Sequence, residues 1–557
     1  MSVAAGARRA WRWLADVPPV LVVLLLGSFA LAHLVSYPER TSGDPLFNSP
    51  HENVRYQLAE RWLDAGRPTY PLPLHDRLPA DIAPALTPRD AGLLDGAVVP
   101  KDFAYAVALT TGLLATAPWA PALTTTVSAV ALLLVTGLLG CHVLGSRGAG
   151  VLAAALLAAT TPFWSASSGL VETGATTAAL LLAGVLVLLL RRRRTVAADG
   201  ARSGVGLDAL AGALLGVAVG THYATVLLAA GIALAFARRR DGGSGPRLGA
   251  LVMAAIVVLL PVLAFNAWVY GSPLTDGYSV GVDFLDVSIG ENTAGLFTLR
   301  PGLLAAHLGT YVVRWEVLLL LILAAVGAWS ARVGGTRPGI SVLGRACLLG
   351  GLPFLVFSGA RPLSGVDVFL VNASLMRYLA PVAAMLAVIA AGGVLVVARH
   401  RPLLAGALAV ATIVGGLAVV ADGAQGPFDI RDRIPRDRVQ RALARRIIPE
   451  DAVVITGRAD KFLWPARATL SAPYLVDEPP AEGDDTHIAL RAPTPARLAG
   501  VVTSVLDEGL EVYLWNEGSW FTRDRRGALA DLDERLAAEG IERIDTGLAD
   551  LWRLGPG

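Results

Sequence analysis

Residues 52–56 read Glu-Asn-Val-Arg-Tyr, and they follow the first hydrophobic segment of the chain, at about residues 18–37. Glu52 and Arg55 are three residues apart, so their side chains share one face if this stretch is helical. A carboxylate and a guanidinium where a membrane-bound chain first emerges into water indicate a reaction site at the bilayer surface. The alternative is a surface ion pair worth less than about 1 kcal/mol.

The composition indicates that most of the chain lies in a membrane. Hydrophobic residues make up 54% of the 557 residues and charged residues 17%, whereas soluble domains carry roughly 25% charged residues. The net charge of +2 is too small to indicate a nucleic-acid partner. Cys141 and Cys347 lie near predicted cytoplasmic helix ends, and no Cys/His cluster points to structural zinc.

Apolar segments of about 20 residues can span a bilayer, and basic residues tend to stay in the cytoplasm. Applied from the N-terminal arginines onward, these two rules predict about eleven transmembrane helices. We expect them at residues 18–37, 120–145, 148–167, 170–190, 206–220, 222–237, 248–270, 313–331, 343–358, 377–398 and 402–421. Residues 18–37 lack a small-residue cleavage site, which favours an anchor over a removed signal peptide. The tetra-arginine at 191–194 is read as a topology determinant.

The predicted series of spans also determines on which side of the membrane each end of the chain is expected. The N-terminus is expected in the cytoplasm of a multi-pass plasma-membrane protein, and an odd number of spans puts the C-terminal domain outside. We predict a transmembrane domain over residues 1–421, with a polar outer loop over 38–102. A separate extracytoplasmic domain is predicted over 422–557. The apolar run 103–118 is short and is expected along the interface.

The C-terminal domain shows alternating strand and helix patterns. Ala452–Thr456 and Leu510–Trp515 are strand-like, and helical patterns lie near Pro495–Asp507 and Arg526–Ala538. Such alternation predicts a small α/β layer domain.

Three further polar sites fall on the predicted outer side, at Lys101, Glu172 and His222-Tyr223. Each alone has a structural explanation: a snorkelling lysine, a carboxylate at a helix N-terminus, and interfacial aromatics. If these polar residues were unrelated to one another, we would expect them on both sides of the membrane. The predicted spans also hold few ionisable residues near mid-membrane, where transporters keep ion relays. The outer interface is therefore the expected place of chemistry.

Together these motifs resemble those of polytopic C-type-fold glycosyltransferases, the superfamily of dolichyl-phosphate-mannose protein mannosyltransferases and bacterial aminoarabinose transferases. That family opens its first outer loop with an acidic motif, commonly Asp-Glu-x-Arg-Tyr. Residues 52–56 occupy its places, with Glu52 for the usual aspartate and Asn53 for the second acid. Lys101 matches the lysine of a Lys-Pro-Pro-like segment, although the two prolines are replaced.

The resemblance continues over roughly residues 20–400. Gly-Leu-Val-Glu-Thr-Gly resembles a second acidic position, with Glu172 for aspartate, and Thr221-His222-Tyr223 resembles a Thr-Lys-Tyr turn. Asn266–Tyr278 is similar to a segment common in these proteins. Arg377-Tyr378-Leu379 followed by Pro381 resembles an Arg-Tyr-Leu-x-Pro helix start.

The resemblance implies the C-type glycosyltransferase fold, and inverting transfer of a hexose or pentose from a polyprenyl-phosphate sugar in the cell envelope. The acceptor would be a hydroxyl of a glycan, lipid or protein. Glu52 is the expected base, with Glu172 orienting acceptor or sugar. The expected phosphate- and substrate-binding residues are Arg55, Tyr56, Lys101, His222, Tyr223, Arg377 and Tyr378.

Several alternatives stay open. No cofactor is indicated, but His51, Glu52 and His75 leave a divalent metal possible because their spacing is not diagnostic. Trp515 and Trp520 either stack on sugars or pack into a core. The rival functions are a transporter or flippase of lipid-linked sugars, and a catalytically silent relative that binds lipid or a partner protein.

Overall fold

The computed structural model describes residues 17–556, apart from a set of short segments. These are residues 43, 89–90, 102–103, 172, 198–203, 238–247, 278–279, 281–300, 335–337, 360–368, 477–491, 518–519 and 523–526. The chain forms two compact units, each with its own hydrophobic core. Unit 1 comprises Met1–Thr41, Ala122–Val262 and Leu299–Arg431, and unit 2 comprises Ser42–Pro121, Leu263–Thr298 and Asp432–Gly557.

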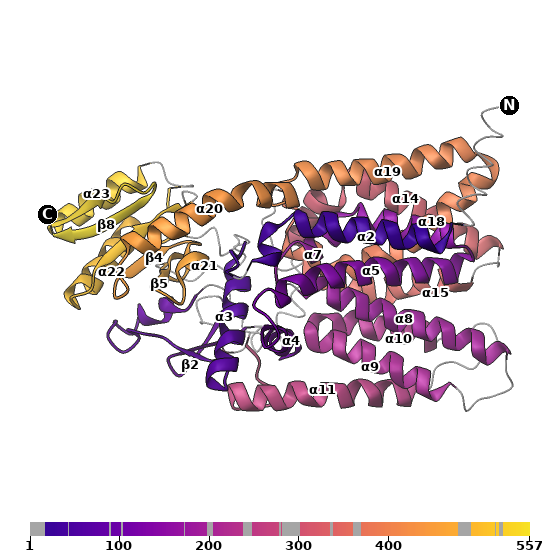
Figure 1. Cartoon of the computed structure of the whole chain (residues 1–557), viewed down its shortest axis with the longest axis horizontal. Coiled ribbons are helices and arrows are strands. Elements are labelled where there is room, and N and C mark those ends of the chain that lie inside the picture. The colour runs from indigo at the N-terminus through magenta and orange to yellow at the C-terminus, as the bar shows by residue number, and fades with distance from the viewer. Residues whose placement is uncertain are drawn as a thin grey trace. The chain divides into compact units, whose positions relative to one another are not determined.

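Unit 1 is helical (Figure 1). Its α-helices, including the three that extend into unit 2 (α5, α11 and α20), are α2 (Pro19–Val35), α5 (Ala120–Leu144), α6 (Arg147–Ala158), α7 (Thr161–Ser167), α8 (Gly174–Ala197), α9 (Val205–Thr221), α10 (Val226–Ala237), α11 (Leu248–Tyr270), α13 (Pro301–His307), α14 (Trp315–Gly334), α15 (Pro338–Ala346), α16 (Leu352–Gly359), α17 (Ser374–Tyr378), α18 (Ala380–His400), α19 (Pro402–Asp422) and α20 (Pro427–Ile447). Short 3-10 or π turns lie at Pro38–Thr41, Tyr223–Thr225, Leu308–Val312 and Cys347–Gly351.

Each predicted span coincides with a helix or with consecutive helices, so the multi-pass α-helical membrane fold is confirmed. In the part of the chain that the structure describes, seven helices are long and apolar enough to cross a membrane. A bent pair raises this number to eight, while α2, α9 and Tyr223–Ala237 are shorter apolar helices. The expected count of eleven therefore stays a prediction.

The predicted span over 148–167 is a bent pair and not one straight helix. Helices α6 and α7 meet at an angle of 73°. The hydroxyl of Thr160 accepts a hydrogen bond from the backbone amide of Phe163, which makes Thr160 the N-cap of a new helix. Pro162 in the first turn of α7 suits a helix start and cannot continue the ladder of α6.

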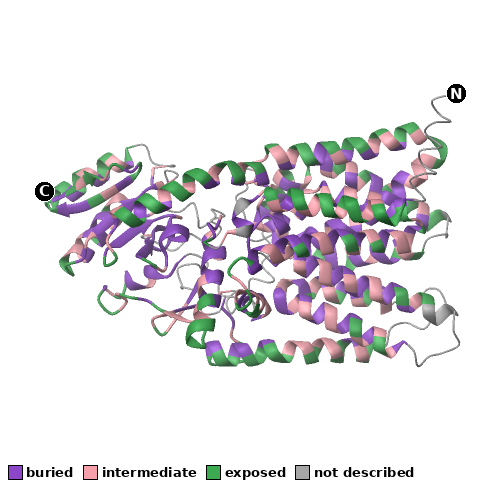
Figure 2. Cartoon of the chain, viewed as in Figure 1, coloured by how far each residue is buried: buried purple, intermediate pink, exposed green. Residues whose placement is uncertain are grey.

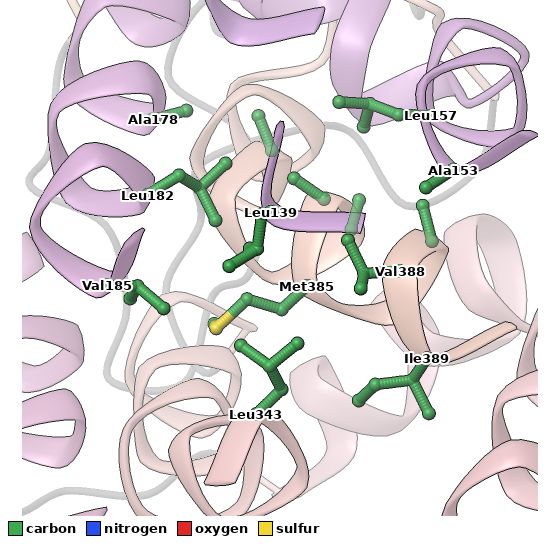
Figure 3. Packing of buried hydrophobic residues seen from close by; sticks show 14 of the residues in the cluster. Leu139, Ala153, Leu157, Ala178, Leu182, Val185, Leu343, Met385, Val388 and Ile389 are labelled. Carbon is green, nitrogen blue, oxygen red and sulfur yellow. The ribbon is translucent and has the colours of Figure 1, made fainter. Parts of the chain in front are cut away.

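Helix α18 forms the centre of unit 1. In its most apolar stretch 72% of the residues are buried, against 17% for α11 (Figure 2). Met385, Val388 and Ile389 on α18 point toward apolar side chains of the surrounding helices, such as Leu182 on α8 and Leu343 on α15 (Figure 3). Figure 2 also shows many exposed residues along α2 and α11, and their apolar side chains suit contact with lipid.

Glycines let α14 and α18 approach closely. A Cβ added to Gly393 on α18 would collide with the carbonyl oxygen of Leu323 on α14. A Cβ added to Gly327 on α14 would likewise collide with the carbonyl oxygen of Ile389. Small residues that allow backbones to touch are typical of helix pairs in membranes, where apolar surface alone does not drive association.

We expect Gly393→Val to destabilise the protein by about 1–3 kcal/mol or more, because the new side chain overpacks this contact. The measurement is the thermal unfolding of the purified protein in detergent. Gly406→Val on α19 is the matched control, since an added Cβ there meets no atom within 4 Å. Equal melting temperatures for the two variants would contradict the close packing of α14 on α18.

The described residues of unit 2 form two β-sheets. Its elements are α3 (Pro50–Ala65), β1 (Tyr70–Pro71), β2 (Ala91–Leu94), β3 (Ala97–Pro100), α4 (Ala104–Leu114), β4 (Val453–Thr456), α21 (Asp460–Leu463), β5 (Ala468–Ser471), α22 (Pro495–Asp507), β6 (Val512–Trp515), α23 (Ala528–Ala538), β7 (Ile541–Asp545), β8 (Leu551–Pro556) and 3-10 turns at Ala83–Leu86 and Ala472–Tyr474. The first sheet is antiparallel, in the order β1-β3-β2. The second has the order β5-β4-β6-β8-β7, with β5, β4 and β6 parallel and β8 and β7 antiparallel.

The expected C-terminal α/β layer domain is confirmed, and both predicted strands and both predicted helices are present within two residues at each end. Helix α3, in the segment predicted as the first outer loop, shares the core of this domain. Val54 and Leu58 on α3 belong to the same buried cluster as Val453 on β4. Ser471 at the end of β5 donates a hydrogen bond to the carbonyl of Thr87, at 3.1 Å. The predicted boundary at residue 421 between a transmembrane and an extracytoplasmic domain remains a prediction, because the division into compact units does not show where the membrane lies.

Candidate active site

Helix α3 begins with a capping box that fixes Glu52. Ser49 is the N-cap, and its hydroxyl accepts a hydrogen bond from the amide of Glu52. In return, one carboxylate oxygen of Glu52, Oε2, accepts from the amides of Asn48 at 3.1 Å and Ser49 at 3.2 Å. Glu52 is 1% exposed. The local sequence thus produces a buried carboxylate with a defined orientation.

Arg55 lies one turn further along α3 and is 3% exposed. Its Nη2 donates to Nε2 of His51 at 2.8 Å, so that ring nitrogen acts as an acceptor. Because Glu52 and Arg55 are both buried, the alternative of a solvent-exposed surface pair is wrong. A buried guanidinium and a buried carboxylate cost far more to desolvate than surface groups, and their presence calls for a role or for partners.

Tyr56 completes the motif as a hydrogen-bond donor. Its hydroxyl donates to the carbonyl of Pro118 at 3.3 Å, and its ring packs on Phe47. Burial, together with the nearby carboxylates of Glu60 and Asp44, raises the pKa of Tyr56 to about 12. The phenol therefore stays protonated and cannot serve as the base near neutral pH.

Lys101 follows β3 directly and is half-buried. The turn before it is held by Tyr270, whose hydroxyl donates to the carbonyl of Pro100 at 2.6 Å. A Cβ added to Gly277 would collide with the same carbonyl, so only glycine fits there. The Asn266–Tyr278 segment, singled out by its sequence, thus packs against the Lys101 turn in its described part.

Unit 1 brings a second group of predicted residues together. The rings of His222 and Tyr378 are 4.3 Å apart between centroids. His222 lies at the turn between α9 and Tyr223–Ala237, where the sequence placed it. The neighbouring Thr221 shares a hydrogen bond of 2.8 Å with Thr177 on α8.

The side chain of Arg377 on α17 lies against Gly174, the first residue of α8. A Cβ added to Gly174 would come within 2.9 Å of the Cγ of Arg377. Glu172 itself lies outside the described residues, but Gly174 follows it by two positions. The α8 start, the α9 end and α17 are therefore neighbours, as the motifs of residues 172, 221–223 and 377–378 require of a common site.

The metal alternative gains no geometric support. Within the described ranges, no three His, Cys, Asp or Glu side chains lie close enough to hold a metal ion. This includes His51, Glu52 and His75. Trp515 and Trp520 pack into the core of unit 2: Trp515 is fully buried against Phe462. The alternative that Trp515 and Trp520 stack on sugars is therefore wrong.

The sequence reasoning missed a largely buried charge cluster near the ends of β4 and β6. Nζ of Lys461 lies 3.9 Å from Oδ2 of Asp437, and Oε2 of Glu517 accepts from the hydroxyl of Thr456 at 3.0 Å. Burial lowers the pKa of Lys461 to about 8, against the opposing attraction of Asp437. The only available signal was the rarity of lysine, since Lys461 is one of two in the chain.

Glu517 should make the stability of the protein depend on pH. Burial raises the pKa of Glu517 from 4.5 to about 8. The folded protein thus binds this proton more tightly than the unfolded chain, and the stabilisation present below about pH 4.5 is lost as the pH rises to about 8. We expect Glu517→Gln, which stays neutral, to gain melting temperature relative to the wild type between about pH 5 and pH 8. A difference that does not change with pH would contradict this.

No family model matches the sequence, and no curated protein matches it. Solved structures do match. The archaeal oligosaccharyltransferase AglB from Archaeoglobus fulgidus, in complex with an inhibitory peptide and a dolichol-phosphate, is 12% identical. The alignment covers 96% of this chain and 74% of that chain, with a TM-score of 0.50.

The chain has the C-type glycosyltransferase fold. ArnT from Cupriavidus metallidurans bound to undecaprenyl phosphate is 13% identical over 97% of this chain and 100% of that chain, with a TM-score of 0.49. The arabinofuranosyltransferase AftD from Mycobacteria is 14% identical over 98% of this chain and 40% of that chain, with a TM-score of 0.45. At these identities the similarity is one of fold, as expected from the motifs.

Proposed function

We propose that this protein is a membrane glycosyltransferase. It transfers a hexosyl or pentosyl group from a polyprenyl-phosphate sugar to an acceptor hydroxyl at the extracytoplasmic face, with inversion. The observation that carries this proposal is the Glu52 carboxylate, buried and oriented by two backbone amides in a chain of this fold. The dolichol-phosphate in the AglB structure supports a lipid-linked donor.

The roles follow from the chemistry. As the acceptor hydroxyl attacks the anomeric carbon it loses a proton, which Glu52 takes. The leaving phosphate gains charge, and cations beside it stabilise the transition state more than the ground state. Lys101, Arg55 and Arg377 supply them, the arginines through two-pronged contacts. Glu172 orients acceptor or sugar.

His222, Tyr223, Tyr56 and Tyr378 are the proposed remaining substrate contacts. The His222–Tyr378 ring pair combines aromatic faces with polar edge atoms, and both kinds of group can contact a sugar ring. The N-terminus of the chain is proposed to be cytoplasmic and the C-terminal domain extracytoplasmic.

The test is transfer of radiolabelled sugar from a panel of polyprenyl-phosphate sugars by purified protein in nanodiscs. Label that reaches an acceptor or water establishes the activity and names the donor. Glu172→Ala should then lose turnover while remaining folded. Donor binding without turnover would favour the silent relative, and movement of intact donor across vesicle membranes would favour a flippase.

A further inference from the structure

A short strap leads into helix α3, and its last residue contacts the proposed base. It comprises residues Asp44–Asn48, and its last residue supplies one of the two amides that hold Glu52. We call it the 44–48 strap. Any displacement of the strap moves that amide, and with it the carboxylate oxygen that accepts from it.

Two arginines of helix α20, about two helical turns apart, donate hydrogen bonds to this strap. The guanidinium of Arg441 donates to both carboxylate oxygens of Asp44, at 2.6 and 3.3 Å, and to the carbonyl of Pro45 at 3.4 Å. Arg441 is buried, and a forked guanidinium–carboxylate pair fixes direction as well as distance.

The second arginine acts nearer to Glu52. Nη2 of Arg433 donates to Oδ1 of Asn48 at 2.9 Å. The backbone amide of the same Asn48 donates to Oε2 of Glu52 at 3.1 Å. Two hydrogen bonds therefore connect a side chain of α20 to the carboxylate of Glu52 through one residue.

A third contact holds the first turn of α3 from another element. The amide group of Asn53, the residue after Glu52, donates to the carbonyl of Trp464 at 2.8 Å and to that of Asp460 at 3.5 Å. Asn53 is itself buried. Residues on both sides of Glu52 are thus anchored to the part of the chain after residue 431.

We propose that Arg433 and Arg441 are positioning residues for Glu52, so that the C-terminal part of unit 2 holds the base in place through the 44–48 strap. This inference rests on the proposed function of Glu52. Misplacement of a catalytic group by about 1 Å can cost about a hundredfold in rate. The segments that these hydrogen bonds connect, Ser42–Pro121 and Asp432–Gly557, belong to the same compact unit.

The first test compares Arg433→Ala, Arg433→Lys and the control Arg446→Ala, an exposed arginine on the same helix. We expect Arg433→Ala to lower the turnover number about ten- to a hundredfold, with the KM for the donor changed by less than about threefold. Arg433→Lys keeps a donor toward Asn48 and should recover part of the rate. An unchanged turnover number, or a change confined to KM, would overturn the proposal.

The second test needs no activity. Hydrogen–deuterium exchange of the full chain in nanodiscs measures the protection of the amides of Asn48 and Ser49. We expect faster exchange in Arg433→Ala and Arg441→Ala and wild-type exchange in Arg446→Ala. Unchanged protection would overturn the anchoring, even if the wild type transfers sugar. If the wild type transfers no sugar but protection falls as expected, the proposed function fails while the anchoring stands.

Discussion

Glu52→Gln should lower sugar transfer by about a hundred- to ten-thousandfold, the usual contribution of a general base. Glutamine has nearly the shape of glutamate, and its carbonyl oxygen can still accept from the amides of Asn48 and Ser49. Glutamine is also compatible with a capping box at this position. The variant therefore removes the base while α3 keeps its start. The measurement is the initial rate of sugar transfer with the donor that the wild type uses. Thermal unfolding of the same variant checks that it is folded.

Ser49→Ala is the matched control, because it removes the capping hydroxyl and leaves the carboxylate. Loss of an N-cap costs about 0.5–2 kcal/mol, so this variant should melt earlier but retain turnover within about tenfold. If Glu52 only caps the helix, Glu52→Gln will be active, and Glu52→Ala will resemble Ser49→Ala. Either result would remove Glu52 from the proposed mechanism.

Asp208→Ala should destabilise the protein by about 3–5 kcal/mol. Asp208 on α9 and Arg191 on α8 form an ion pair of 2.7 Å, with side chains 0% and 6% exposed. Removal of one partner of a buried pair leaves a desolvated charge, which costs more than the pair contributes. The measurement is the free energy of unfolding in detergent micelles.

Two controls isolate the burial. The Arg553–Glu511 pair of unit 2 has a similar length, 2.9 Å, but both side chains are nearly half exposed. Glu511→Ala should therefore cost about 1 kcal/mol or less. The double variant Asp208→Leu with Arg191→Met should recover most of the lost stability, because an apolar pair of similar volume can replace buried ions. If the double variant is no more stable than Asp208→Ala, the pair is not the cause.

The tetra-arginine at 191–194 illustrates how a sequence interpretation is incomplete. Its net positive charge alone is enough for the tetra-arginine to act as a topology signal. The structure adds that its first member, Arg191, is buried against Asp208 on the next helix. The pairing depends on how α8 and α9 pack, which the charge pattern does not specify.

Much of the fold was predictable because it is determined locally. An apolar run in lipid has to satisfy its backbone hydrogen bonds internally, so each predicted span is helical. The turn at His222 and the α/β alternation after residue 452 also depend on neighbouring residues. So does the start of α3, where Ser49 and Glu52 satisfy the first amides of the helix.

The sequence by itself thus determined the membrane-embedded helices, the class of the C-terminal domain and the motifs of the candidate site. Only the tertiary structure decided which segments share a core and what holds Glu52. Arg433 and Asn48 are 385 residues apart, and Asn53 and Trp464 are 411 apart. Helix periodicity and hydropathy report on a residue's nearest neighbours along the chain. Contacts over such separations form only when the packed chain brings the partners together, so no local sequence pattern predicts them.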